Sequence, residues 1–148
     1  MRAPRTGPGI IYPCSRTPVL VGGGHHFTVL AAGGQACGVR TDGAVLCWQG
    51  ELPPAVVPGV SRARGVSVGG SHACAVTGAG AIVCWGDNRY SQLGVPGPGS
   101  SAAAVLTAPP AAPAVSVSAG AVHTCSVTHD GRAACWGVQD AGRLGTGG

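Results

Sequence analysis

Cysteine is the residue type in this chain whose spacing most clearly allows chemistry. Six of the seven cysteines form three pairs with the same internal spacing. A cysteine pair can form a disulfide, bind zinc, or pack as two small apolar thiols. Which of these occurs depends on the strands and turns that carry the cysteines. The pairs are Cys37 with Cys47, Cys74 with Cys84, and Cys125 with Cys135.

The three cysteine pairs lie in three copies of one sequence block. Residues 29–48, 66–85 and 117–136 align without a gap, and each block ends in Cys-Trp. A repeated block joined by connectors of different length predicts an array of similar units. Cys14 falls in an incomplete unit before the first block. We divide the chain into residues 1–17 (N-terminal segment, remnant of a preceding repeat), 18–50 (shortened unit 1), 51–99 (unit 2) and 100–148 (unit 3).

Each block has the alternating pattern of a β-hairpin closed by a three-residue turn. The turns end in Gly43, Gly80 and Gly131, where such a loop needs a left-handed residue. In this register the two cysteines of a block lie directly opposite each other. At a non-hydrogen-bonded position their Cα atoms would be about 4.5 Å apart, which is the short end of the disulfide range.

The pairing predicts three local disulfides and hence an oxidising compartment, extracellular or at the cell surface. The alternative is that the cysteines are buried free thiols. A zinc site is not expected, although His72 and His123 stand close to cysteines, because no C-x-x-C knuckle occurs and Gln35 replaces histidine in the first block. We expect both histidines to be hydrogen-bonded residues near strand ends.

Composition limits the remaining function classes. The chain is 45% apolar, 9% charged and 4% aromatic, so it should fold around a core of small residues. The net charge of +4 comes from nine scattered arginines and predicts no nucleic-acid footprint. No apolar run is long enough to span a membrane, and no signal peptide follows Arg2 and Arg5. The acidic residues are isolated from one another, and the sequence has no nucleophile or phosphate-loop motif. We therefore expect neither an enzyme nor a bound cofactor.

The segment 100–113 is rich in Ala and Pro. Because Pro109, Pro110 and Pro113 interrupt it, a helix is not expected there. We predict a flexible or polyproline-like loop between units.

Residues 72–94 (HACAVTGAGAIVCWGDNRYSQLG) and 119–147 resemble repeats of the regulator of chromosome condensation family. They are most similar to the cysteine-containing version in secreted bacterial proteins and Crinkly-type plant receptor ectodomains. The resemblance implies an all-β fold, a partial β-propeller of about three four-stranded blades from a ring that usually has seven. Unit 1 departs from the family because it lacks the connector D-N-x-x-x-Q-L-G. We therefore expect a fragment whose parent protein supplies the remaining blades, and which alone is marginally stable or self-associates.

The resemblance and the lack of catalytic residues predict a non-enzymatic propeller module for protein–protein or ligand interaction, part of a larger secreted or cell-surface protein. Function in such folds lies on loops. We assign the candidate binding loop to Asp87, Asn88, Arg89 and Tyr90. The expected partner is a protein or peptide, with no nucleic acid and no membrane span in this chain. The alternative is a chromatin-associated guanine-nucleotide exchange factor for a small GTPase, which the cysteine pairing disfavours.

The three tryptophans that end the blocks should be buried between neighbouring blades. They are Trp48, Trp85 and Trp136. We expect Trp136 to be the most exposed of the three, because no further unit follows it in this chain.

Overall fold

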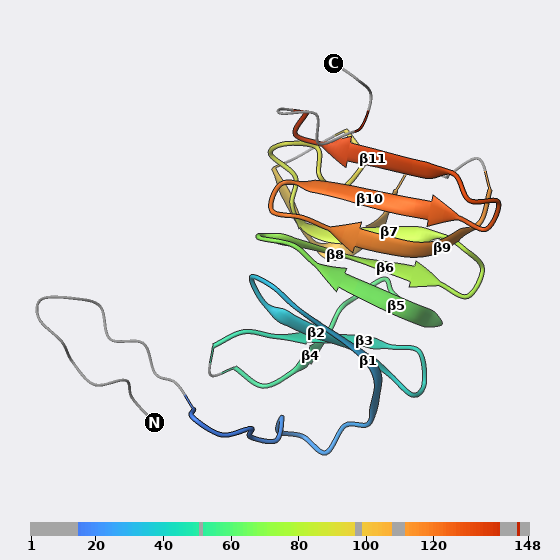
Figure 1. The fold of residues 1–148 in the computed structure, drawn as a ribbon. Helices are drawn as coiled ribbons and strands as arrows, with labels where there is room; N and C mark the ends of the chain where they lie inside the picture. The colour runs from blue at the N-terminus through green and yellow to red at the C-terminus, as the bar shows by residue number, and fades with distance from the viewer. Residues whose placement is uncertain (1–14, 51, 97–98, 108–111, 140–144, 146–148) are drawn as a thin grey trace, which may run out of the picture.

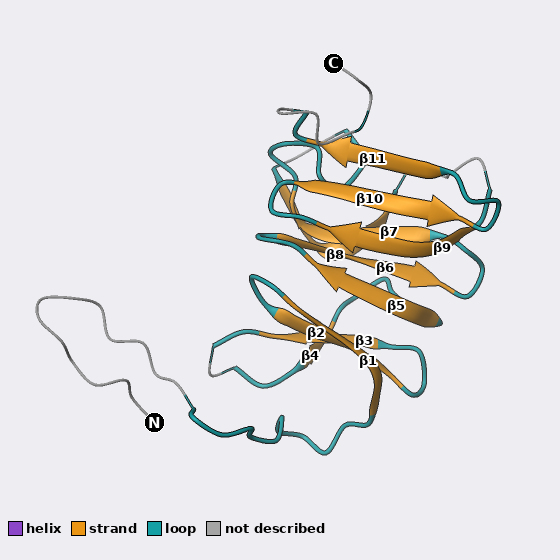
Figure 2. Cartoon of the chain, in the orientation of Figure 1, coloured by secondary structure: helices purple, strands orange, loops and turns teal. Residues whose placement is uncertain are grey.

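The computed structural model describes residues 15–50, 52–96, 99–107, 112–139 and 145. Within these ranges the chain forms β-strands and no helix, and none of the described segments is a helix able to cross a membrane (Figure 2). The strands form three antiparallel sheets that follow one another in sequence and lie side by side (Figure 1). The all-β fold predicted from the sequence is confirmed.

Strand order within each sheet follows the order along the chain. The first sheet contains β1 (Phe27–Ala32), β2 (Ala36–Arg40), β3 (Val45–Trp48) and β4 (Ala55–Val56). The second contains β5 (Ala63–Val68), β6 (His72–Thr77), β7 (Ile82–Asp87) and β8 (Ser100–Leu106). The third contains, among the described residues, β9 (Ala114–Ala119), β10 (His123–Thr128) and β11 (Ala133–Gly137).

The central hairpin of each sheet has the register expected from the sequence. The turn of the first hairpin is closed by the Arg40 amide, which donates to the Ala44 carbonyl at 2.8 Å. Gly43, Gly80 and Gly131 have φ values of +86°, +82° and +87°, the left-handed conformation that glycine adopts without steric cost. Turn type, glycine position and strand pairing therefore agree in all three units.

The register places the cysteines of each block on opposed positions of neighbouring strands, and the structure joins them as disulfides. The pairs are Cys37–Cys47, Cys74–Cys84 and Cys125–Cys135, with S–S distances of 2.10, 2.16 and 2.10 Å and Cα–Cα distances of 4.0 Å. Each bond crosses one hairpin, so it links two strands of the same sheet and leaves the contacts between sheets to other residues. Cys14 lies outside the described residues.

The prediction of a loop over residues 100–113 is wrong for its first half. Ser100–Leu106 forms β8, which pairs with β7 through partners such as Val83 with Leu106. These seven residues contain no proline, so their amides can complete the otherwise open edge of β7. The proline that disfavours regular structure comes after the strand: Pro109 and Pro110 lie outside the described residues.

The fourth strand of a sheet also comes from a different sequence unit than the other three strands. β4 lies in residues 51–99 but pairs with β3 of the first sheet, and β8 lies in residues 100–148 but pairs with β7 of the second. The first and second sheets therefore each take their last strand from beyond their own sequence unit. The sheet and the repeat unit are offset by one strand.

The apolar core lies between the sheets and is made of small side chains. Trp85 is the largest contributor to the first cluster, with 4% of its surface exposed, whereas Trp48 and Trp136 are half-buried. Trp48 instead stacks near Phe27, with ring centroids 5.5 Å apart. The cluster between the first and second sheets is Cys37, Val39, Val45, Val57, Val60, Ala63, Val68, Ala73, Ala75, Val83 and Trp85. The cluster between the second and third is Cys74, Val76, Ile82, Cys84, Leu93 and Ala114, with Trp136 packed on it.

Glycine loops before the second strand of each sheet bring neighbouring sheets into main-chain contact. The Gly34 amide donates to the Gly69 carbonyl at 2.9 Å, and the Gly70 amide donates to the Gly120 carbonyl at 3.3 Å. A Cβ atom on Gly34 would overlap the carbonyl of Gly70, and one on Gly69 would overlap the carbonyl of Gly120. The close approach therefore requires glycine.

A second set of main-chain bonds joins the sheets at the hairpin turns. The Ala63 amide donates to the Gly43 carbonyl, and the Ala114 amide donates to the Gly80 carbonyl, both at 2.9 Å. Consecutive sheets are thus connected at both ends by backbone groups, with the apolar clusters between these two points.

We predict that the three disulfides form locally in the oxidised protein. Peptide mapping without reduction should recover each pair within its own block, and Cys74→Ser with Cys84→Ser should lower the free energy of unfolding by about 2–3 kcal/mol, the chain-entropy value for a loop of this length. Cys14→Ser is the matched control and should leave stability unchanged. A dominant disulfide between different blocks would contradict the register.

We predict that Gly69→Ala destabilises the chain by at least about 1–3 kcal/mol, because the new methyl group overlaps the neighbouring sheet's main chain. Gly22→Ala is the control, since a Cβ there meets nothing within 4 Å. Urea unfolding of both variants measures the difference. Equal stabilities would show that the sheets can separate at this point without cost.

Candidate interaction surface

The predicted binding loop begins where β7 ends and runs back to β8. Asn88, buried with 6% of its surface exposed, organises the loop from inside. Its side-chain amide donates to the Val95 carbonyl at 3.0 Å, while its side-chain oxygen accepts from the Leu93 amide at 3.1 Å. Its own amide donates to the Gly99 carbonyl at 2.8 Å. Asn88 therefore orders the main chain of the loop through these hydrogen bonds.

The next part of the connector inserts between the second and third sheets. Gln92 is fully buried, and its main-chain carbonyl accepts from the Thr124 hydroxyl at 2.8 Å and from the Trp136 indole nitrogen at 2.9 Å. Leu93 is 1% exposed in the second apolar cluster. The Q-L-G part of the connector thus fastens the third sheet to the second. The role of the Gln92 main-chain carbonyl leaves no side-chain signal in the sequence.

Asp87 and Arg89 form a local ion pair at the start of the loop. The Arg89 guanidinium donates to Asp87 at 2.9–3.0 Å, and the Arg89 amide donates to the same carboxylate at 3.1 Å. The hydrogen bonds from Arg89 lower the pKa of Asp87 to about 2. The carboxylate is thereby occupied, and the arginine side chain keeps 71% of its surface exposed.

The structure consequently divides the four predicted binding residues into two groups. Asp87 and Asn88 hold the loop together, and Arg89 and Tyr90 face solvent, with Tyr90 52% exposed. The Tyr90 amide donates to the Gln92 side-chain oxygen at 2.9 Å, which fixes the main chain beneath the exposed ring. Residues 140–144 of the corresponding connector after Trp136 lie outside the described residues.

His72 extends the contact between the second and third sheets. Its ring is 1% exposed, and its Nε2 atom lies 2.8 Å from the Thr124 hydroxyl, which in turn donates to the Gln92 carbonyl. Burial lowers the pKa of His72, so the ring is neutral near pH 7. No group of three metal-ligating side chains occurs among the described residues. Histidine at this position serves a hydrogen-bond relay between sheets.

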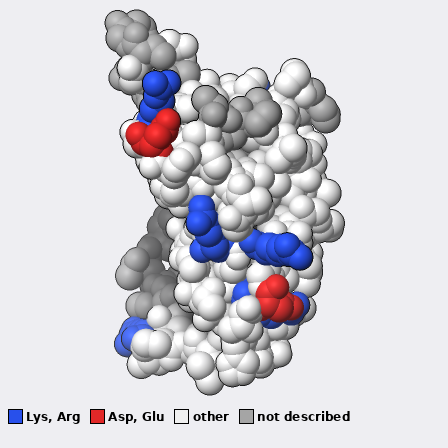
Figure 3. Space-filling model, turned by 90° about the vertical axis from the view of Figure 1, so that its right-hand side faces the viewer, with Lys and Arg blue, Asp and Glu red and all other residues white. Residues whose placement is uncertain are grey.

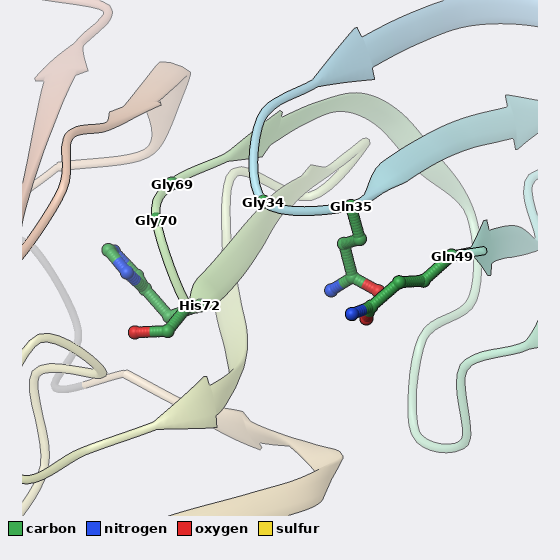
Figure 4. A pocket seen from close by; sticks show the side chains of 7 residues that line it. Gly34, Gln35, Gln49, Gly69, Gly70 and His72 are labelled. Carbon is green, nitrogen blue, oxygen red and sulfur yellow. The ribbon is translucent and has the colours of Figure 1, made fainter. Parts of the chain in front are cut away.

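A polar cavity of about 230 Å³ lies between the first and second sheets. Three glycines, Gln35, Gln49, Ser71 and His72 line it. In Figure 4 the side chains of Gln35 and Gln49 extend toward each other, while the His72 ring points to the opposite side. Sequence reasoning did not identify this site, because its two glutamines come from separate loops with no shared motif.

Charged side chains are sparse on the described surface. Figure 3 shows one face on which small blue and red groups, some of them touching, lie in a largely uncharged surface. Each described aspartate pairs with an arginine two residues away, and no pair is buried: Arg40–Asp42, Arg89–Asp87 and Arg132–Asp130. The described part of the chain offers no dense basic patch of the kind that nucleic-acid binding requires.

Consecutive antiparallel sheets of three or four described strands, packed face to face through small apolar residues, define part of a β-propeller. Residues 63–92 match the family model described as the regulator of chromosome condensation (RCC1) repeat. This segment of the chain is therefore similar to a repeat of that family. The matched segment runs from β5 to Gln92, and thus includes the glycine loop, the disulfide hairpin and the connector.

Solved structures agree with this assignment. Prp20p from Saccharomyces cerevisiae matches with a TM-score of 0.77 and 21% identity over 87% of this chain and 35% of its own length. The ectodomain of the receptor kinase CR4 from Physcomitrella patens matches with a TM-score of 0.59 and 26% identity over 78% of this chain and 31% of its own. The CRINKLY ectodomain of Arabidopsis thaliana ACR4 matches with a TM-score of 0.51 and 27% identity, covering 80% and 39%.

The chain spans about a third of the length of these solved structures. A comparison with curated protein sequences finds no significant match. The structural matches establish the propeller fold that the sequence predicted, and they include both Prp20p and receptor kinase ectodomains.

We predict that stability depends on His72 in mildly acidic solution. The unfolded chain takes up a proton on this residue near pH 6.5, but the buried ring does not, so the free energy of unfolding should fall as the pH drops below about 6.5. His72→Gln, which copies Gln35 of the first unit, should weaken this dependence, whereas His129→Gln at an exposed turn should not. Urea unfolding between pH 5 and 8 tests the difference. An unchanged slope in His72→Gln would contradict the assignment.

Proposed function

We propose that the chain is a non-enzymatic propeller module that binds a protein or peptide through the connector surface around Arg89 and Tyr90. The observation that carries the proposal is the division of this loop into a buried anchor and an exposed tip. Gln92 and Leu93 are held between two sheets, while the arginine and tyrosine beside them remain open to solvent.

The chemistry of the tip supports a protein partner. Tyrosine and arginine are enriched among residues that dominate binding energy at protein interfaces, because each combines a large contact area with hydrogen-bonding groups. The main chain beneath them is already ordered by Asn88 and Gln92, so binding does not carry the entropic cost of ordering the loop. An exposed, pre-ordered Arg–Tyr pair is therefore suited to recognition.

The three hairpin disulfides support a location outside the cytosol, in a larger secreted or cell-surface protein that supplies further blades. The receptor ectodomains among the structural matches are in accord with this setting. The alternative function, nucleotide exchange on a small GTPase, draws on Prp20p, a protein described with its binding properties to Gsp1p and histones. That match has 21% identity and supports the fold. Reduced thiols in protein from its natural compartment would favour the exchange-factor alternative.

We predict that a photo-crosslinking amino acid in place of Tyr90 captures a discrete protein partner when the folded chain is incubated with cell-surface and secreted proteins of its source. The same group at the exposed His129 should capture nothing above background. Arg89→Ala should weaken binding of the captured partner about tenfold or more. Arg132→Ala is the matched control, because Arg132 is also exposed and paired with an aspartate two residues away. Equal capture at both positions would contradict the proposed surface.

A further inference from the structure

The two interfaces between sheets differ in their polar contacts. Between the second and third sheets, the Gln92 carbonyl accepts hydrogen bonds from Thr124 and Trp136. Between the first and second sheets, the aligned positions of those two donors are Ala73 and Trp85. Alanine has no hydroxyl, and the Trp85 indole nitrogen donates no hydrogen bond to any described residue.

The missing contact follows from the shortened connector. β4 begins at Ala55, seven residues after Trp48, so unit 1 has no counterpart of the Gln-Leu-Gly insertion. Val57 and Val60 fill the apolar part of the interface instead. The polar part has no such replacement, and the cavity of about 230 Å³ borders the same interface.

The cavity presents unpartnered amide groups. The side chains of Gln35 and Gln49 make no hydrogen bond with any described residue, and Figure 4 shows their ends close to each other. Each amide has two N–H donors and one carbonyl acceptor. The Ser71 hydroxyl, already bonded to Asp87 at 3.3 Å, forms another part of the lining.

The residues that line the cavity indicate which kind of ligand it can bind. No Arg, Asp or Glu is among the lining residues that the structure describes, and burial keeps His72 neutral, so a charged ligand gains little there. Two side-chain amides match a group that offers both a donor and an acceptor, as a peptide bond does. Gly34, Gly69 and Gly70 contribute only main chain to the lining, so they add no charged or bulky side chain to it.

We propose that this cavity is a second binding site, which takes an uncharged main-chain segment of a partner peptide, with Gln35 and Gln49 pairing to its peptide groups. The segment plays at the first interface the part that the chain's own Ser-Gln-Leu-Gly plays at the second. The proposal rests on the function proposed above in one respect, that the chain is an interaction module, but it concerns different residues from Arg89 and Tyr90.

The test uses the acetylated and amidated tetrapeptide Ser-Gln-Leu-Gly as the probe and the side-chain NH₂ signals of glutamine in NMR as the readout. Titration into the oxidised 148-residue chain should shift the signals of Gln35 and Gln49 saturably, and leave those of the buried Gln92 in place. A probe N-methylated at its Gln and Leu amides should bind at least tenfold more weakly, because the two central main-chain N–H donors are lost. No saturable shift, or equal binding of the methylated probe, would overturn the proposal.

Variants separate this site from the connector surface. Gln49→Ala changes an exposed residue and should fold normally while weakening the probe at least tenfold, and Gln35→Ala should do the same. Arg89→Ala, the variant that tests the proposed function, should leave probe binding unchanged. Retained binding in Gln35→Ala with Gln49→Ala would overturn the cavity site without affecting the connector surface. Loss of the Tyr90 crosslink with intact probe binding would overturn the connector surface alone.

Discussion

The close main-chain approach at the glycine loops is the constraint on which the rest of this structure depends. A Cβ atom on Gly34 would overlap the Gly70 carbonyl of the next sheet, and one on Gly69 would overlap the Gly120 carbonyl. Because no side chain fits there, the sheets can pack with a narrow core of Val, Ala and Cys and need few aromatic residues. The low aromatic content and the high glycine content of the sequence are thus two consequences of one packing geometry.

The disulfides and the connectors stabilise different parts of the structure. Each disulfide fixes a hairpin within one sheet, so it holds the strands in register but does not join sheets. Glycine main-chain bonds and the apolar clusters join them, and at the second interface the buried connector adds the Gln92 carbonyl with its two donors. The repeats agree in the hairpin and differ in the connector. The two proposed binding sites, the connector surface and the cavity, therefore lie where the connectors differ.

The sequence predicted what depends on local chemistry. The two-residue alternation and the turn glycines determined the hairpin register, and the register placed the cysteines opposite each other. The strand β8 was missed because its sequence, rich in Ala and Ser, has little strand signal of its own. It forms because β7 presents an unpaired edge, which is a property of the folded sheet. The Gln92 carbonyl and the Gln35–Gln49 cavity were missed for the same reason, since both arise between units.

The exchange rates of the two indole N–H protons test most directly whether the connector stabilises the second interface through the Gln92 carbonyl, a contact that the first interface lacks. Trp85 is more deeply buried than Trp136, but only Trp136 donates to a main-chain carbonyl, that of Gln92. Hydrogen exchange followed by NMR on the oxidised chain at neutral pH should therefore show slower exchange at the Trp136 indole than at the Trp85 indole. Slower exchange at Trp85 would mean that burial alone controls these interfaces, and would contradict the account.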